Sequence, residues 1–382
     1  MKIAMVLDDS IDRPDGVQQY VLTLGAYLER QGHEVHYVCS DATREDITVH
    51  SLARNVGVTF NGNGLRIPLP TSRAALRDFL EAQRYDVIHV QIPHSPLFAA
   101  RVVDEARRVQ ARTVRIVGTF HILPSGRVSA AATRALGVWL RRNLRRFDEF
   151  CAVSEPAAQF ARASFGIDAT VIPCAIDTAL FADAPRSPRA DDRLVVAFLG
   201  RLVERKGVLE LVAAVAALPA PMRAGLDVRI GGKGPLREKV VEAVAAADLG
   251  DMVTLTGFVS EEDKPGFYAD ADIAVFPATG GESFGIVLIE AMASGSGVVI
   301  GGDNLGYLSV LGERSEVSVN PRDTSAFARS LARLIDDSAL RAELHREQAE
   351  RVRRFDVAVV GKQILSLYGE RQGDSGPSPS PR

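Results

Sequence analysis

The sequence predicts an α/β protein with two doubly wound parallel sheets that face each other across a cleft. Its 382 residues are too many for one comfortable core and suit two domains of about 180 residues each. Short runs rich in β-branched residues alternate with helical patterns before residue 182, and the alternation starts again after residue 193. This alternation is typical of parallel sheets with helices on both faces.

The first half of the chain contains one set of alternating elements. In order, we expect Lys2–Leu7, the helix Gly16–Gln31, Glu34–Cys39, Val87–Val90, the helix Pro96–Val109, Thr113–Phe120, Glu149–Val153 and Thr170–Ile172. A polar, turn-rich passage follows at residues 183–193. We therefore expect a Rossmann-like domain over residues 1–182 and a linker over residues 183–193.

The second half repeats the pattern. In order, we expect Leu194–Leu199, the helix Gly207–Leu218, Asp227–Ile230, the helix Leu236–Ala247, Val253–Thr256, the helix Glu261–Ala269, Ile273–Phe276, the helix Phe284–Ala293, Gly297–Ile300, and the helices Asp323–Asp336, Ser338–Arg354 and Asp356–Tyr368. This predicts a second Rossmann-like domain over residues 194–355 and a C-terminal helix over residues 356–371 that returns to the first domain. Residues 372–382 lack the apolar content to order themselves.

Composition excludes several classes of function. A formal net charge of -3 gives no sign of a nucleic-acid partner. The three cysteines, Cys39, Cys151 and Cys174, are too widely spaced for a zinc or redox motif and fit a reducing cytoplasm. No signal-peptide pattern and no run of about 18 apolar residues is present, so we expect any membrane contact to be peripheral.

The loop after the predicted strand Leu194–Leu199 concentrates cations. It places Arg201 and Lys206 five residues apart across a bend, next to Gly207. In open α/β sheets ligands bind beyond the carboxyl ends of the strands, and a forked guanidinium with a point-charge ammonium suits a pyrophosphate. The alternative is that this loop is charged only because it is exposed to solvent and binds no ligand.

The strongest candidate segment follows the predicted strand Ile273–Phe276. A Gly-Gly turn presents Glu282, and a helix expected from Phe284 would offer free backbone N–H groups to an anion. The residues that would form this anion site are Ser283, Phe284, Gly285 and Ile286. Glu290 lies inside an otherwise apolar helix and needs a partner. Sugar hydroxyls suit both carboxylates, and a core helix with one solvated glutamate is the alternative.

Two glycines complete the set. Gly16 opens the first helix, whose free N–H groups favour a phosphate or a sugar oxygen. Gly232 lies in the turn Gly231-Gly-Lys-Gly234, although glycine-rich turns of this kind are common for purely geometric reasons. No Gly-x-Gly-x-x-Gly follows the first strand, which disfavours a dehydrogenase.

Together these segments resemble the retaining glycosyltransferases of the GT-B fold, family 4, also called glycosyl transferases group 1. The resemblance covers nearly the whole chain, and its most specific part is the Glu-x7-Glu motif at Glu282 and Glu290. It implies that Arg201 and Lys206 neutralise the leaving diphosphate of a nucleotide-sugar donor. It also implies that Glu282 contacts the transferred hexose and that Glu290 holds the ribose.

The same resemblance implies further donor contacts. Gly16 would approach the phosphates, and His121, at the end of a predicted strand, would touch the sugar near the reacting carbon. Phe258 and Val259 would border the nucleobase beside the turn at Gly232. The implied catalytic set is His121, Arg201, Lys206 and Glu282.

The mechanism implied by the family is front-side attack, in which the leaving phosphate oxygen takes the proton of the acceptor. Electrostatic stabilisation of the departing diphosphate is then the main contribution of the protein. Asp270-Ala-Asp272 has the spacing of a metal motif, but it stands where a helix passes into a strand. Because side-chain cations are available, we expect no metal and no other cofactor.

Within the family, the segments resemble the phosphatidylinositol mannosyltransferases, which favours GDP-mannose as donor. The resemblance places Asn61 and Arg66 against an inositol phosphate, and His94 stands in the acceptor loop where an asparagine is expected. The helix expected over Thr133–Phe147 combines leucines and one tryptophan with arginines, a pattern that could rest on anionic lipid. A domain helix with a solvated basic side is the alternative.

Three other readings stay open at this point. One is a glycosyltransferase that uses a UDP-sugar and a soluble or polysaccharide-precursor acceptor. Another is a nucleotide-sugar epimerase of the same two-domain shape. The third, from a different class, is a catalytically silent nucleotide-sugar binding protein, against which the intact set of Arg201, Lys206, Glu282 and Glu290 argues.

Overall fold

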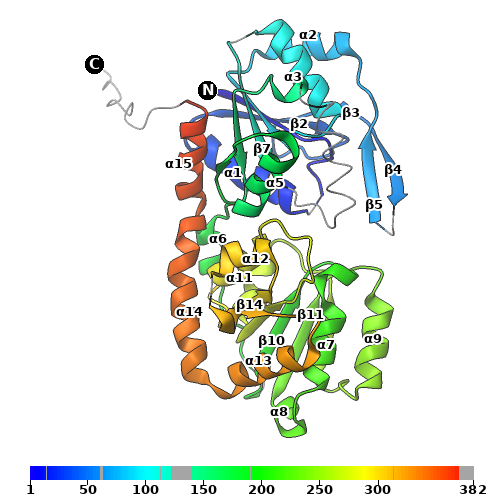
Figure 1. Ribbon diagram of the computed structural model, residues 1–382, viewed down its shortest axis with the longest axis vertical. Helices are drawn as coiled ribbons and strands as arrows, with labels where there is room; N and C mark the ends of the chain where they lie inside the picture. Colours follow the sequence, from blue (N-terminus) through cyan, green and yellow to red (C-terminus); the bar gives the residue numbers. More distant parts are fainter. Residues whose placement is uncertain are drawn as a thin grey trace, which may run out of the picture.

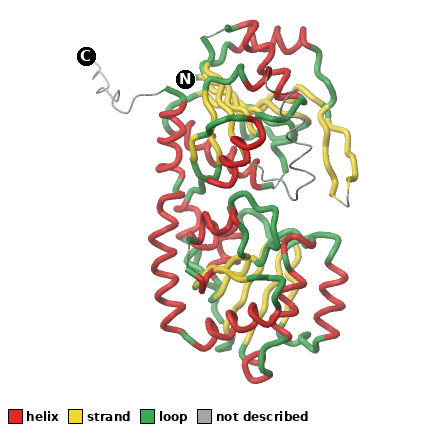
Figure 2. Tube along the Cα trace, in the orientation of Figure 1, coloured by secondary structure: helices red, strands yellow, loops and turns green. Residues whose placement is uncertain are grey.

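The chain forms two lobes, each built on a parallel sheet (Figure 1). The structure, a computed structural model, describes residues 1–13, 15–60, 63–111, 113–121, 140, 142–189, 191–312 and 314–369. The strands of the two parallel sheets lie inside the lobes and helices surround them (Figure 2). Among the described residues, no helix combines the length and apolar character needed to cross a bilayer.

The first lobe contains a seven-stranded sheet in the order β3-β2-β1-β6-β7-β8-β9, with every pairing parallel. Its strands are β1 (Lys2–Val6), β2 (Glu34–Ser40), β3 (Val49–Ala53), β6 (Val87–Gln91), β7 (Arg115–Phe120), β8 (Glu149–Ala152) and β9 (Thr170–Val171). The described helices of this part are α1 (Gly16–Arg30), α2 (Arg73–Gln83), α3 (Phe98–Val109), α5 (Glu155–Phe165) and α6 (Thr178–Ala182). These strands are mostly buried, as expected for a sheet covered on both faces.

The second lobe contains a six-stranded parallel sheet in the order β12-β11-β10-β13-β14-β15. Its strands are β10 (Leu194–Leu199), β11 (Leu226–Gly231), β12 (Val253–Gly257), β13 (Ile273–Phe276), β14 (Val298–Gly302) and β15 (Ser318–Val319). Its described helices are α7 (Val208–Ala216), α8 (Ala220–Ala224), α9 (Arg237–Ala246), α10 (Lys264–Ala269), α11 (Ile286–Ala293), α12 (Leu305–Leu311), α13 (Thr324–Asp336) and α14 (Ser338–Val352). The last described helix, α15 (Val357–Leu367), returns to the first lobe.

The strand order reverses at β1 in the first sheet and at β10 in the second. β1 pairs with β2 on one side and β6 on the other, and β10 pairs with β11 and β13. Ligands of doubly wound sheets bind beyond the carboxyl ends of the strands at such points. The loops that follow β1 and β10 are therefore the places where the topology favours a ligand.

A hairpin in the first lobe was not predicted. β4 (Asn55–Phe60) pairs antiparallel with β5 (Asn63–Pro68) in a separate two-stranded sheet, which extends from the lobe in Figure 1. Gly57 and the glycines at residues 62 and 64 weaken the strand pattern in the sequence. Because the hairpin lies outside the main sheet, its sequence contains no long run of apolar residues that would indicate a buried strand.

Three predicted helix starts were wrong by two or three residues, and one of them is that of α3, which begins at Phe98 rather than Pro96. α11 begins at Ile286 rather than Phe284, because Gly285 has a φ of 118° and its neighbour Tyr307 leaves no space for a side chain there. α10 begins at Lys264 rather than Glu261, because the Ser260 hydroxyl accepts the Asp263 backbone N–H and forms a turn ahead of the helix.

The chain crosses between the lobes twice, and the two crossings touch. The Ile176 backbone N–H donates to the Phe355 carbonyl over 3.1 Å, and the Val357 N–H donates to the Ile176 carbonyl over 2.8 Å. Beside them, the Asp356 carboxylate accepts from the Thr178 hydroxyl. The lobes are thus joined by a short pair of hydrogen-bonded segments, with α6 immediately after one of them.

The C-terminal helix α15 lies against α1 of the first lobe (Figure 1). Gly361 of α15 faces Tyr27 of α1 so closely that a Cβ would overlap the tyrosine ring, with Cζ only 2.9 Å away. Just beyond the helix, the Tyr368 hydroxyl lies 2.6 Å from Nδ1 of the buried His89. α15 and Tyr368 are therefore part of the core of the first lobe.

We predict that Gly361→Ala lowers the free energy of unfolding by about 1–3 kcal/mol, the usual cost of overpacking. Alanine favours a helix interior over glycine by about 1 kcal/mol, so the sign of the change reports the contact with Tyr27. Chemical denaturation measures it, with Gly250→Ala as control because no atom lies near a Cβ at that exposed position. An equally stable or more stable Gly361→Ala variant would contradict the packing of α15 on α1.

Candidate active site

The basic loop after β10 and the glycine turn after β13 meet at Glu282. Lys206 Nζ lies 2.9 Å and Arg205 Nη1 lies 2.5 Å from the same carboxylate oxygen of Glu282. The Glu282 side chain is 12% exposed and that of Lys206 is 16% exposed. Burial lowers the pKa of Lys206, and the neighbouring Glu282 opposes that shift.

Backbone packing at Gly207 holds these two loops together. Gly207 has a φ of 73°, and a Cβ there would overlap the carbonyl of Pro277, which follows β13. The Thr279 N–H also donates to the Arg205 carbonyl over 2.9 Å. Only glycine permits this close approach of two backbone segments. The loop that carries the cations is consequently fixed on the turn that presents Glu282.

Glu290 lies inside α11 and is 4% exposed. Lys264 Nζ lies 3.4 Å from one of its oxygens and the Tyr268 hydroxyl 3.3 Å from the other, while Lys264 also contacts Glu261 over 2.7 Å. Burial raises the pKa of Glu290, and Lys264 opposes the rise. The partner that a carboxylate in this helix needs is therefore already present in the chain.

A cavity of about 150 Å³ opens between the lobes next to Glu290. Its lining residues are Gln19, Thr23, Ala175, Ile176, Asp177, Leu180, Phe181, Glu261, Pro265, Ile286 and Glu290. One wall comes from α1 and the other from α10 and α11. Glu290 thus faces a space that a ligand between the lobes could enter.

The first lobe reaches this site through Gly16 and His121. A Cβ on Gly16 would lie 3.4 Å from Ile286 Cδ1 at the start of α11. The Ser283 hydroxyl donates to the His121 carbonyl over 2.5 Å, and the Ser154 hydroxyl donates to the Ser283 carbonyl. The structure therefore brings the predicted residue Gly16 next to Ile286, and His121 next to Ser283.

The His121 imidazole is 6% exposed, and burial lowers its pKa to about 3. Its Nε2 lies 2.6 Å from Oε1 of Gln91, and the Tyr20 ring packs edge-on against it at a centroid distance of 5.2 Å. The ring is consequently neutral at physiological pH. It can accept or donate a hydrogen bond, but it does not serve as a cation for phosphate.

The turn after β11 lies beside the basic loop. Gly232 has a φ of 126°, and a Cβ there would overlap the carbonyl of Gly200. Nearby, the Phe258 ring is 55% exposed, and Lys233 Nζ lies 5.0 Å from its centroid. Val259 lies close to the backbone of Gly231. An exposed aromatic ring on a backbone turn offers a flat apolar surface at the edge of the site.

The side chains of two further predicted residues, Arg201 and Phe284, do not contact Glu282 or Glu290 in the described part of the chain. Arg201 is exposed in the basic loop, and the side chain of Phe284 points into the core against Phe355. Among the described residues the structure shows no hydrogen bond or ion pair from the Arg201 side chain. The backbone N–H of Phe284 belongs to the turn before α11, so only its main chain is placed for an anion.

Of the three predicted acceptor residues, the structure describes only His94 with its side chain. Asn61 lies outside the described residues, and Arg66 is described only by its backbone, which pairs with Gly57 in the hairpin. The His94 ring stacks on Phe120 and Phe165 at centroid distances of 5.6 and 5.3 Å. Burial lowers the pKa of His94 to about 4. Its ring is therefore part of an aromatic cluster.

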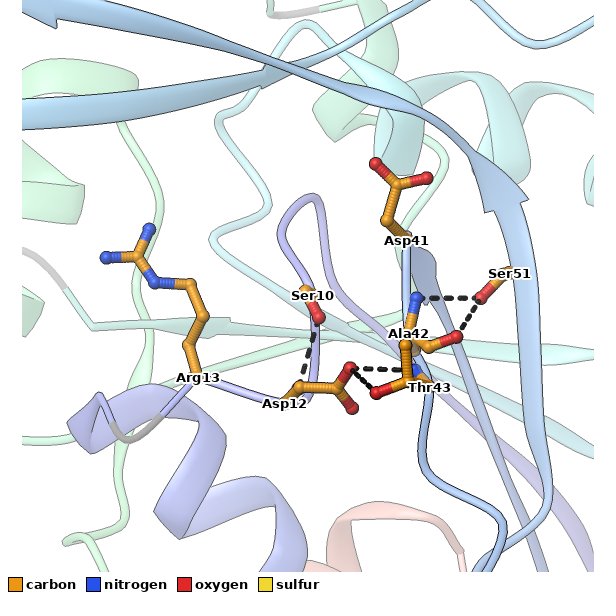
Figure 3. Close-up of a pocket in the computed structure, with 7 residues that line it drawn as sticks. All are labelled: Ser10, Asp12, Arg13, Asp41, Ala42, Thr43 and Ser51. Atoms are coloured by element: carbon orange, nitrogen blue, oxygen red, sulfur yellow. Dashed lines mark hydrogen bonds between the residues drawn. The ribbon is translucent and has the colours of Figure 1, made fainter.

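A larger hollow of about 550 Å³ lies in the first lobe, at the carboxyl ends of β1 and β2 (Figure 3). It is lined by Ser10, Asp12, Arg13, Asp41, Ala42, Thr43 and Ser51. Asp12 accepts from both the backbone N–H and the hydroxyl of Thr43, and Arg13 is paired with Asp9 and Asp15. The described lining is polar and mixed in charge.

The carboxylates of the Asp270-Ala-Asp272 segment form ion pairs and hydrogen bonds within the protein. Asp270 is 2.9 Å from Arg229, and Asp272 is 2.8 Å from Arg189 while it also accepts the Val195 backbone N–H. In the part of the chain that the structure describes, no group of three metal-ligating side chains comes together. These aspartates bind the linker and neighbouring strands to each other.

Sequence reasoning missed three residues that shape this site. Arg205 stands between the two predicted cations but was not singled out, although it makes the shortest contact to Glu282. Lys264 is 26 residues before Glu290, and no local pattern links them. Gln91 is likewise 30 residues from His121. Spacing along the chain identifies loops, but not which side chains from separate loops meet.

We predict that Lys264→Met lowers the free energy of unfolding by about 3 kcal/mol at neutral pH, since removing one partner of a buried pair leaves an uncompensated charge. Without Lys264, burial and the nearby Glu261 raise the pKa of Glu290 and only the Tyr268 hydroxyl opposes them, so this pKa should rise further. The loss should then shrink as the pH falls and Glu290 takes up a proton.

Denaturant titrations at several pH values check this, with the exposed α9 lysine variant Lys239→Met as control. A loss of stability that is the same at every pH would contradict the coupling of Lys264 to Glu290.

Comparison with known families matches both lobes. Residues 14–180 match the family described as Glycosyltransferase Family 4, and residues 182–352 match Glycosyl transferases group 1. Among similar proteins is the phosphatidyl-myo-inositol mannosyltransferase of Mycolicibacterium smegmatis, 32% identical over 96% of this chain and 93% of that protein. The protein of the same name from Propionibacterium freudenreichii is 30% identical over 96% of this chain and 94% of that protein.

Solved structures show the same fold. A glycosyltransferase from Rickettsia africae superposes with a TM-score of 0.77 at 17% identity, over 98% of this chain and 99% of that one. Anabaena HepE, solved in complex with UDP and glucose, superposes with a TM-score of 0.74 at 18% identity, over 97% of this chain and 99% of that one. With its two Rossmann-like lobes and its GT-B fold, the chain belongs to the glycosyltransferases of family 4, glycosyl transferases group 1.

Proposed function

We propose that the enzyme transfers a hexose from a nucleoside-diphosphate sugar, with GDP-mannose favoured, to phosphatidylinositol or a similar lipid, with retention of anomeric configuration. The observation that supports the donor side most is the meeting of Arg205, Lys206 and Glu282 beside the first turn of α11. The full-length relatives named phosphatidyl-myo-inositol mannosyltransferases support the mannosyl donor and the lipid acceptor.

In this proposal the donor lies between the lobes. Its diphosphate binds Arg201, Lys206 and the free backbone N–H groups at the start of α11, because a helix N-terminus and cations together favour anions. Glu282 turns from its cations to the sugar hydroxyls. Glu290, which faces the cavity between α1 and α10, accepts from the ribose. The Phe258 ring and Gly232 border the base.

The transfer step then needs little covalent chemistry from the protein. The bond from the anomeric carbon to the phosphate oxygen breaks, and the acceptor oxygen bonds to that carbon on the same face. The acceptor proton passes to the departing phosphate oxygen. Arg201 and Lys206 stabilise the negative charge that grows on the diphosphate. We propose that these cations supply the counter-charge without a metal ion.

The acceptor is proposed to enter from the first lobe. The polar hollow beyond β1 and β2 (Figure 3) lies beside the loop that leads to Gly16, and its hydroxyls and carboxylates suit a polyol headgroup. Asn61 and Arg66, from the hairpin, are proposed as its further contacts. We propose that the enzyme works in the cytoplasm as a peripheral protein of the membrane that carries its acceptor.

We predict that Lys206→Ala and Arg201→Ala each lower kcat by about 10²–10³-fold, as expected for the loss of one contact to a developing anion. Glu282→Ala should abolish turnover of the sugar. Release of nucleoside diphosphate is measured with GDP-mannose, UDP-glucose, UDP-N-acetylglucosamine and UDP-galactose, with and without phosphatidylinositol vesicles.

Glu238→Ala and Lys239→Ala, on the exposed side of α9, serve as matched controls. We expect release of GDP from GDP-mannose and no release from the three UDP-sugars, and we expect the vesicles to stimulate that release. Turnover of a UDP-sugar that is indifferent to lipid would replace the proposed donor and acceptor, and consumption of no donor would refute the proposal as a whole.

A further inference from the structure

Gln91, the last residue of β6, lies directly beside His121. The two strands are neighbours in the sheet, with Gln91 in register with Thr119 of β7, two residues before His121. Both side chains are buried, Gln91 at 1% and His121 at 6% exposure. Oε1 of Gln91 lies 2.6 Å from Nε2 of His121. This is a short, enclosed hydrogen bond between two side chains at the carboxyl edge of the sheet.

The chemistry of this contact determines where the imidazole carries its proton. An amide oxygen only accepts hydrogen bonds, so Nε2 of His121 must be the protonated nitrogen. The other nitrogen, Nδ1, then has a free lone pair. Among the described residues the structure shows no hydrogen bond to Nδ1. The hydrogen bond made by one ring nitrogen thus sets the role of the other.

Other contacts hold the imidazole of His121 in place but do not determine its tautomer. Tyr20 of α1 packs edge-on against it, and the Ser283 hydroxyl binds the His121 backbone carbonyl from the second lobe. Neither of these contacts involves a ring nitrogen. Of the described side chains, only Gln91 engages one, and the Gln91 amide nitrogen has no hydrogen-bond partner of its own among them.

We infer that Gln91 is a positioning residue that holds His121 as its Nε2–H tautomer and so makes Nδ1 a hydrogen-bond acceptor for a hydroxyl of the donor sugar. The sugar part of this inference rests on the proposed function, whereas the tautomer does not. His121 therefore acts as an acceptor rather than as a proton donor. Loss of the Gln91 carbonyl oxygen releases the ring to exchange tautomers and weakens that contact.

The titratable groups that face His121 do not compete for this role. From α1, Tyr20 has a pKa raised by burial, and from β6, His89 has a pKa lowered by burial to about 3. Both are neutral between pH 6 and pH 9. The protonation state of His121 in this range is accordingly set by its own burial and by the residue at position 91.

Nitrogen NMR of the full chain with ¹⁵N-labelled histidine tests the tautomer directly. The chain has seven histidines, and loss of one pair of signals in His121→Asn assigns those of His121. The expected result is a protonated Nε2 and an unprotonated Nδ1 in the wild type, and a mixture of tautomers in Gln91→Met. A protonated Nδ1 in the wild type, or an unchanged tautomer in Gln91→Met, would overturn the inference even if the enzyme is active.

Kinetics separate positioning from mere support of the fold. Gln91→Met should lower kcat roughly tenfold at every pH, the scale of one lost hydrogen bond. Gln91→Glu keeps an acceptor oxygen but adds a charge that raises the pKa of His121, so its activity should recover as the pH rises and the imidazole loses its second proton. Gln159→Met, at an exposed position of α5, is the matched control.

Parallel pH profiles for Gln91→Met and Gln91→Glu would show a structural role only and would contradict the inference. A wild-type enzyme that consumes no donor would instead count against the proposed function. In that case the NMR result still decides whether Gln91 sets the tautomer of His121.

Discussion

The pairing of the Glu282 carboxylate with cations from a different βα loop is the interaction on which the donor side of this enzyme depends. Glu282 and Lys206 are both largely buried, and each would be costly alone. Together with Arg205 they neutralise one another and hold the loops after β10 and β13 in one arrangement. The backbone contact of Gly207 with Pro277 makes that arrangement possible.

The same pairing keeps the buried charges of Glu282 and its cations neutralised when no ligand is bound. In the proposed complex, a diphosphate would compete with Glu282 for the cations, and a sugar would compete with the cations for Glu282. Binding both would exchange one set of partners for another, so the buried carboxylate and the buried ammonium would each keep a partner. The buried carboxylate of Glu290 likewise has partners within the chain, Lys264 and Tyr268.

Among the described residues, polar contacts join the lobes both at the site and where the chain crosses between them. Ser283 contacts His121 and Ser154 across the cleft, and the segments at Ile176 and Phe355 are hydrogen-bonded to each other just before α6. Closure of lobes around a donor is a general way to exclude water from transfer chemistry. Here the residue that bridges the lobes stands directly after Glu282, which links their approach to the position of the carboxylate.

The fold could be predicted from the sequence because its strands are buried on both faces and leave continuous apolar runs such as Leu194–Leu199. The hairpin β4–β5 could not, because it pairs only with itself. For Glu290 the sequence suggested sugar hydroxyls as partners, whereas the structure places Lys264 beside it, a residue that the local sequence does not mark. His94 shows the opposite case, since a polar residue in a candidate loop packs among phenylalanines that come from distant segments.

The structure of the complex with GDP is the most direct test of this account. The diphosphate is expected to lie within ion-pair distance of Arg201 and Lys206, at the first turn of α11, and Glu282 is expected to lose its contact with at least one of its two cations. A nucleotide bound away from these loops, or one bound there while both contacts of Glu282 remain, would contradict the central role of this pairing.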